Sequence, residues 1–281
     1  MGLFLVFLSA AGFASLAVLG KFAFAEGFAL ASVLAWRFIV AALLLAPVIM
    51  ARGVTRYKPA LLGTAFLLGF VGYAVQATLF FVALQRTSAA VTSLLLYTYP
   101  AFVALIGRIV FHENLSGRRL AALLLAMGGV VLTIPPGGTS VELSGALVAL
   151  ASGVWYACYL SFGARRVQAL DAVTTTGILS VGASISFAAA AILSGGLQIP
   201  SNMSSWLLML GLGLLATVLP VVALFAAIPR LGITRTSIMS TLEPVLTALF
   251  GFLLLGEALS PAQLLGGGLV VVSAVVLQLF G

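Results

Sequence analysis

The sequence predicts an all-α integral membrane protein with ten transmembrane helices in two inverted five-helix repeats. Composition is the first observation behind this prediction: 63% of the residues are hydrophobic and 7% are charged, whereas about 25% are charged in a soluble domain. A set of ten apolar runs is the second, and an internal duplication is the third. Together they exclude a water-soluble globule, and the net charge of +7 then reflects cytoplasmic loops instead of nucleic-acid binding.

Each apolar run is long enough, at about 20 residues, to cross a bilayer as a helix. The first run has no basic segment before it, so we expect a membrane span there and not a cleaved signal. Short loops separate the runs, and the function is therefore expected inside the bilayer. The runs cover roughly residues 3–24, 28–50, 59–83, 88–110, 117–135, 142–162, 173–194, 203–228, 232–255 and 261–280.

The duplication is found by aligning residues 83–116 with residues 227–260, without a gap. We expect one repeat over residues 1–137 and the other over residues 138–281. Five helices is an odd number, so the second repeat enters the membrane from the opposite face, a construction common in secondary transporters. Among the identical pairs are Arg86 and Arg230, Thr92 and Thr236, Ser93 and Ser237, Pro100 and Pro244, Gly107 and Gly251, Glu113 and Glu257, Leu115 and Leu259, and Ser116 and Ser260.

Loop charges predict the orientation. If the helices alternate in direction, one side of the membrane receives Arg86 with three acidic residues, and the other receives ten basic residues. The positive-inside rule makes the basic side cytoplasmic, so both termini are expected in the cytoplasm. The ten basic residues are Arg52, Arg56, Lys58, Arg108, Arg118, Arg119, Arg165, Arg166, Arg230 and Arg235.

Glu243 is the one acid deep inside an apolar run, and Pro244 follows it. An ionisable side chain at that depth is costly and indicates a functional site. Spacings of four, three and four place Glu243 on one helix face with Thr236, Ser240 and Thr247. Three roles stay open for Glu243: it holds a coupling proton, it binds a substrate amine, or it forms a static ion pair.

The candidate partners for such an ion pair are Lys21 and Arg37, the two cations inside the first two runs. Pro100 and Pro244 break equivalent helices near mid-membrane, where transporter sites lie. A packed structural kink is the alternative interpretation. The presence of a proline at this position in both repeats favours a hinge beside a site.

Aromatic residues mark a candidate substrate site. Tyrosine and tryptophan usually form interfacial belts, but several here fall in the middle of their runs, which favours a cavity lining. Such walls suit an aromatic or amphipathic solute, and equally a drug-like cation. The candidate substrate-binding residues are Tyr73, Gln76, Phe80, Tyr97, Tyr99, Trp155, Tyr156, Tyr159, Ser240 and Glu243.

Four stretches resemble the EamA-type drug/metabolite transporter superfamily over nearly the whole chain. They are WRFIVAALLL at residues 36–45, ALQRTSAAVTSLLLYTYPAF at residues 83–102, the Glu113-Asn114-Leu115 step, and TLEPVLTALFGFLLLGEAL at residues 241–259. Within it the chain is most similar to the YddG aromatic amino acid exporters of bacterial inner membranes. The resemblance implies an inner-membrane location and export by alternating access through a central cavity between the repeats.

One departure from the superfamily pattern is His112, which stands where a glycine usually precedes the glutamate of the first repeat. The sequence therefore predicts a secondary-type transporter that exports small metabolites, aromatic or amphipathic amino acids. The alternatives are a broad exporter of other drugs and metabolites, and a non-transporting scaffold or receptor. No enzyme is predicted, since the acids are scattered singly and no Walker A motif occurs.

The expected partners are a small-molecule substrate and membrane lipid, with no nucleic acid. The expected state is a monomer or a weak homodimer. No cofactor is predicted, because a single cysteine, Cys158, and a single histidine argue against disulfide and metal chemistry.

Overall fold

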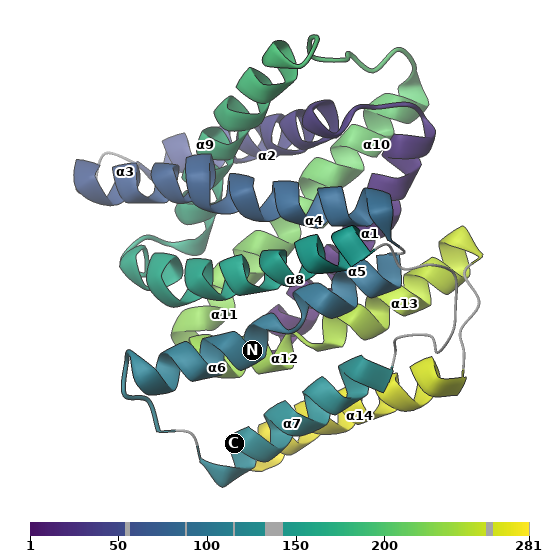
Figure 1. Ribbon diagram of the computed structural model, residues 1–281. Helices are drawn as coiled ribbons and strands as arrows, with labels where there is room; N and C mark the ends of the chain where they lie inside the picture. The colour runs from purple at the N-terminus through teal and green to yellow at the C-terminus, as the bar shows by residue number, and fades with distance from the viewer. Residues whose placement is uncertain (54–56, 88, 115, 133–142, 257–260, 281) are drawn as a thin grey trace.

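The computed structural model of the chain is helical throughout (Figure 1). It describes residues 1–53, 57–87, 89–114, 116–132, 143–256 and 261–280, and no β-strand occurs in these ranges. The first half of the chain forms α1 (Gly2–Ala25), α2 (Leu30–Arg52), α3 (Pro59–Leu67), the π-helical segment η2 (Leu68–Tyr73), α4 (Ala74–Arg86), α5 (Ala89–Leu96), α6 (Tyr99–Ile109) and α7 (Gly117–Leu132).

The second half repeats this order of elements with small differences. It forms α8 (Leu143–Cys158), the π-helical segment η3 (Tyr159–Ala164), α9 (Ala172–Leu193), α10 (Met203–Gly213), the π-helical segment η4 (Leu214–Val218), α11 (Leu219–Leu231), α12 (Ile233–Met239), α13 (Leu242–Leu255) and α14 (Pro261–Phe280). Of the residues named above, Arg56, Leu115, Glu257, Leu259 and Ser260 lie outside the described residues.

Several helix ends follow from local sequence signals. The Asp171 side chain accepts hydrogen bonds from the backbone N–H groups of Val173 and Thr174, at 3.0 and 3.1 Å, and so caps the start of α9. Asn202 caps α10 in the same way through Ser205. At the end of α13 the chain turns through Gly256, whose φ of 68° lies in the left-handed region that glycine tolerates.

The described helices have the length and composition of a multi-pass membrane protein. Seven stretches could each cross a membrane: Gly2–Ala25, Leu30–Arg52, Pro59–Arg86, Leu143–Ala164, Ala172–Leu193, Met203–Leu231 and Ile233–Leu255. Two further apolar helices, Tyr99–Ile109 and Leu120–Gly129, are shorter.

Two of the predicted runs are interrupted helices. The run 88–110 breaks at Tyr97 and Thr98, between α5 and α6, so that Pro100 falls in the first turn of α6, where a missing N–H costs nothing. The run 232–255 breaks at Ser240, between α12 and α13. Pro244 has no N–H to donate to the Ser240 carbonyl four residues before it, and this carbonyl accepts the N–H of Glu243 at 2.9 Å.

The π-helical segments had no counterpart in the sequence prediction. A π turn inserts one extra residue into a helix and is frequent at functional sites. Here η2 interrupts the third predicted run, η3 extends the sixth, and η4 interrupts the eighth.

Equivalent helices of the two halves pack against each other. In Figure 1, α7 lies along α14 at one edge of the molecule, and α2 contacts α9 at the opposite side. Between them α1 packs on α11 and α13, while α8 packs on α4 and α5. The buried core therefore runs through the middle of the bundle, with α1 and α8 at its centre.

Helix backbones approach closely at Gly69 of η2, which faces α9, and at Gly182 of α9, which faces α3. A Cβ added at Gly69 of η2 would lie 1.9 Å from the carbonyl oxygen of Leu179, and one at Gly182 would lie 2.3 Å from that of Phe66. Small residues permit such contacts between membrane helices. This contact fixes the η2 segment, which carries Tyr73 into the core.

Candidate functional site

A small cavity lies at the centre of the bundle. It is formed by α1, α2, η2 with α4, α5, α8 and α13, and its volume is about 30 Å³, which is room for about one water molecule. Small-molecule sites usually measure about 300–1,000 Å³, so this structure shows the site nearly closed. The lining residues are Phe13, Leu16, Arg37, Tyr73, Gln76, Ala77, Phe80, Leu96, Tyr97, Tyr156 and Glu243.

Arg37 brings a positive charge to this cavity from α2. Its side chain is 1% exposed, and its Nε donates to Thr217 Oγ1 at 2.6 Å. Its Nη2 donates to the Ala216 carbonyl at 3.2 Å and to the Tyr73 hydroxyl at 3.4 Å. The guanidinium carbon also lies 4.8 Å from the centroid of the Phe38 ring, a cation–π contact. These hydrogen-bond partners are all neutral, and they hold the guanidinium in place.

Glu243 brings the opposite charge from the first turn of α13. It is 6% exposed, and the Tyr97 hydroxyl donates a hydrogen bond to its Oε2. A carboxylate at a helix N-terminus is favoured by the helix dipole. Because Tyr97 stands at the break between α5 and α6, this hydrogen bond joins the two interrupted helices.

Arg37 and Glu243 face the same cavity without forming an ion pair. Their charges act on each other, but no N···O distance of 4.0 Å or less joins them. Lys21, the other predicted partner, lies toward the carboxyl end of α1, does not line the cavity, and has no ion pair with the residues that the structure describes.

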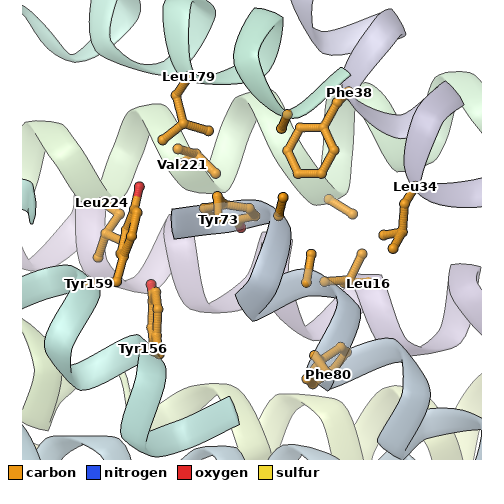
Figure 2. Packing of buried hydrophobic residues seen from close by; sticks show 14 of the residues in the cluster. Leu16, Leu34, Phe38, Tyr73, Phe80, Tyr156, Tyr159, Leu179, Val221 and Leu224 are labelled. Atoms are coloured by element: carbon orange, nitrogen blue, oxygen red, sulfur yellow. The ribbon is translucent and has the colours of Figure 1, made fainter. Parts of the chain in front are cut away.

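The walls between the two charges are aromatic. Tyr99 contacts Tyr97 at 5.2 Å and Tyr156 at 4.8 Å between ring centroids. Tyr156 in turn stacks on Tyr159, at 5.9 Å, and Tyr159 meets Tyr73 edge-on at 5.8 Å. Figure 2 shows Tyr156 and Tyr159 side by side, with Tyr73 facing them from η2. The tyrosines thus form one continuous wall across helices from both halves of the chain.

The structure distributes the predicted substrate residues between the cavity and its surroundings. Tyr73, Gln76, Phe80, Tyr97, Tyr156 and Glu243 line the cavity. Tyr99, Tyr159 and Ser240 are buried beside it. Trp155 is 37% exposed, and its indole N–H donates to the Gly72 carbonyl at 2.7 Å on the outer surface of α8.

Sequence reasoning missed Phe13 and Leu16, the two residues of α1 that line the cavity. α1 is apolar on every side, so no periodic pattern marked these two positions. Leu96 and Ala77 were missed for the same reason, since apolar side chains in a membrane helix are ordinary.

Polar contacts close the bundle at the end that loop charges predict to be cytoplasmic. Arg165 forms an ion pair with Glu113, and the Thr234 hydroxyl donates to the same carboxylate at 2.7 Å. The Arg165 guanidinium also lies 3.9 Å from the Phe111 ring centroid. These contacts join the end of α6 to η3 and α12.

Asp171 ties α9 to the segment after α2 at this same end. Partial burial of the Asp171 carboxyl opposes ionisation, but hydrogen bonds from Thr174 and Tyr57 and the charge of Arg52 outweigh it and lower its pKa to about 2. The Tyr57 hydroxyl lies 2.9 Å away and the Arg52 guanidinium 3.3 Å away.

A larger and more open pocket of about 650 Å³ lies at the opposite end, between the α1–α2 and α9–α10 segments. Glu26 accepts a hydrogen bond from Ser205 at 2.6 Å there. The Gln198 carbonyl accepts the indole N–H of Trp36 at 2.8 Å. These contacts hold the two connecting segments together.

Comparison with known proteins gives consistent matches. The model of the EamA-like transporter family matches residues 1–134 and 143–279. The uncharacterized transporter YdfC of Bacillus subtilis is 28% identical over 203 residues, which cover 72% of this chain and 66% of that protein. The threonine/homoserine exporter RhtA of Escherichia coli is 29% identical over 204 residues, which cover 70% of this chain and 64% of RhtA.

The matched part thus spans about two thirds of the length of these relatives. One crystal structure superposes with a TM-score of 0.79, covering 98% of this chain and 95% of that chain at 20% identity. That likeness concerns the fold alone.

Proposed function

The chain belongs to the EamA-like transporter family, and we propose that it exports small metabolites, amino acids above all, through the central cavity. The observation that carries the proposal is the pair of opposite charges, Arg37 and Glu243, buried at one cavity among apolar helices. Ionisable groups inside a membrane are costly and face a path or a partner. A static scaffold has no use for them.

Two observations bear on the substrate. The amino acid exporter RhtA is among the relatives, which supports an amino acid. The tyrosine wall and the resemblance of the sequence to the YddG exporters favour an aromatic or amphipathic one. A broad exporter of other drugs and metabolites is the alternative, because the same walls suit a drug-like cation.

Transport into proteoliposomes tests both. We expect labelled phenylalanine and tryptophan to cross faster than threonine and a cationic dye. Equal transport of all four would make the protein a broad exporter, and transport of threonine alone would shift the substrate toward that of RhtA. If none crosses, the scaffold or receptor interpretation replaces export.

We further propose ten membrane crossings in two inverted repeats, residues 1–137 and 138–281, in the cell inner membrane with both termini cytoplasmic. In this arrangement α5 with α6, α7 and α14 supply the crossings beyond the seven long helices. The helix breaks support it, since those at Tyr97 and Ser240 lie 143 positions apart, one short of the 144 of the duplication. The overlap of η2 and η4 under the same shift supports it as well.

Labelling of single cysteines tests this topology. In a Cys158→Ser background, Ser201→Cys should react with an impermeant reagent from outside, and Arg166→Cys only from the cytoplasmic face. Labelling of both from one face would exclude the inverted arrangement. Cross-linking of the same preparation checks the proposed monomer or weak homodimer.

Alternating access is part of the proposal because the present cavity holds about one water molecule. A substrate fits only after helices separate, first at one end and then at the other. The breaks beside Pro100 and Pro244 are the proposed hinges, since interrupted helices bend there without losing regular hydrogen bonds elsewhere.

A further inference from the structure

We infer that the cavity recognises a zwitterion by its two ends, with Arg37 binding the carboxylate and Glu243 binding the ammonium group of an α-amino acid. This inference rests on the proposed export function and assigns its substrate chemistry and the two residues that select it. It follows from the hydrogen-bonding positions that the protein leaves open on both side chains, and from where the two side chains lie.

Arg37 has one nitrogen left for a ligand. Its Nε and Nη2 donate to Thr217, Ala216 and Tyr73, while no acceptor among the described residues lies within hydrogen-bonding distance of Nη1. All of its protein partners are neutral. A buried guanidinium with no carboxylate in direct contact is costly, so an anionic group that reaches Nη1 is favoured.

Glu243 likewise has one carboxylate oxygen left for a ligand. Its Oε2 accepts the Tyr97 hydroxyl, and no donor within the described residues reaches Oε1. The carboxylate therefore has acceptor capacity for an ammonium group. Its hydrogen-bond partner is again a neutral group.

The placement of the two charges selects for a dipolar ligand. They stand on α2 and α13, helices from different halves of the chain, and both line one cavity without touching each other. A ligand that carries both charges on one carbon satisfies both residues at once. Its side chain then meets the aromatic wall of Tyr73, Phe80 and Tyr156.

A ligand with a single charge leaves one buried group unpaired. Sites built to pair a polar group reject analogues that lack the matching group much more strongly than apolar pockets reject a missing methylene. An amine alone would leave Arg37 unpaired, and a carboxylate alone would leave Glu243 unpaired. Discrimination therefore comes from both ends of the ligand.

Binding to the purified full-length protein in detergent tests this, by calorimetry with two matched series. The first is phenylalanine, phenethylamine and 3-phenylpropionate; the second is threonine, 1-amino-2-propanol and 3-hydroxybutyrate. In the unmodified protein the amino acid should bind about 10- to 100-fold more tightly than either analogue of its series. Analogues that bind as tightly as both amino acids would overturn the inference, whatever any variant does.

Variants assign the two ends. With Arg37→Gln, phenylalanine should bind no better than phenethylamine, and with Glu243→Gln it should bind no better than 3-phenylpropionate. Matched changes of charge away from the cavity, Glu26→Gln and Arg86→Gln, should keep the original preferences. If Arg37→Gln does not fold, Arg37→Lys retains the cation and should retain the preference for a carboxylate.

Transport of the same compounds separates this inference from the proposed function. Selective binding of amino acids without transport would refute export and support two-ended recognition. Transport of amino acids with equal competition by both analogues would support export and overturn two-ended recognition. Neither binding nor transport of any amino acid would overturn both.

Discussion

Gly153→Ala is expected to disturb the protein at the point where α8 meets the helix break between α5 and α6. A Cβ at Gly153 would lie 2.7 Å from the Leu96 carbonyl oxygen, 2.9 Å from Thr98 Oγ1 and 3.2 Å from the Leu95 carbonyl oxygen. Ordinary contact begins near 3.4 Å. The helices must therefore separate by about 0.7 Å, and backbone carbonyls, unlike flexible side chains, cannot simply swing away.

Overpacking of this kind costs about 1–3 kcal/mol, while replacing a helical glycine by alanine returns up to about 1 kcal/mol. We expect a net loss of about 1–2 kcal/mol, which lowers Tm by a few degrees. The transport rate should fall by more than this small loss of stability would cause. Ser152 and Tyr156 stand on the same turn of α8, and both move away from Gln76 when α8 shifts.

Melting in detergent and transport in proteoliposomes, on one preparation, measure the two effects. The control is Gly211→Ala in α10, where the nearest atom to an added Cβ is 3.7 Å away, so its Tm should hold or rise slightly. A Gly153→Ala protein that melts and transports like this control would refute the packing argument.

Three further changes have defined outcomes. Glu243→Gln keeps the shape of the side chain but cannot ionise, so it should fold normally and lose most pH-dependent transport if this carboxyl couples to protons; normal melting with an unchanged pH dependence would exclude proton coupling. Asp171→Ala should cost about 1 kcal/mol at neutral pH through the lost cap of α9, a figure kept small because the site is partly solvated. Because folding lowers the pKa of Asp171 to about 2 from 3.8, this advantage should be complete above about pH 4 and vanish as the pH falls toward 2; a constant difference in Tm across that range would contradict it. Gly69→Ala, with a Cβ 1.9 Å from the Leu179 carbonyl oxygen, should destabilise the protein more than Gly153→Ala does, while Gly63→Ala, with nothing within 4 Å, should not; equal melting of the two would contradict the close contact.

The sequence predicted the membrane helices and their interruptions, which depend on the length of the apolar runs and on the prolines and charges within them. Runs of about 20 apolar residues indicate membrane helices because the bilayer leaves the backbone few alternatives. Pro100 and Pro244 located the interrupted helices to within a few residues. A proline has no N–H to bond the carbonyl four residues before it, so the helix breaks on its N-terminal side. Glu243 was found because a carboxyl stands out against an apolar helix.

The remaining features depend on contacts between distant segments. An ion pair of Arg37 with Glu243 was one of the open alternatives, but the hydrogen-bond partners of Arg37 are Tyr73 and, from η4, Thr217 and Ala216. No local pattern connects residues 180 positions apart. Phe13 and Leu16 are ordinary apolar residues of α1, and only the fold places them at the cavity. Trp155 lies on the exposed face of α8, although its neighbour Tyr156 is buried.

The central claim is that the cavity beside Arg37 and Glu243 is the transport path. The most direct test introduces Gln76→Cys, at a cavity position, into a Cys158→Ser protein and measures its reaction with an impermeant thiol reagent applied to either face of the membrane. We predict reaction from both faces, slowed in each case by a transported amino acid. Reaction from a single face, or a rate that the amino acid leaves unchanged, would contradict the claim.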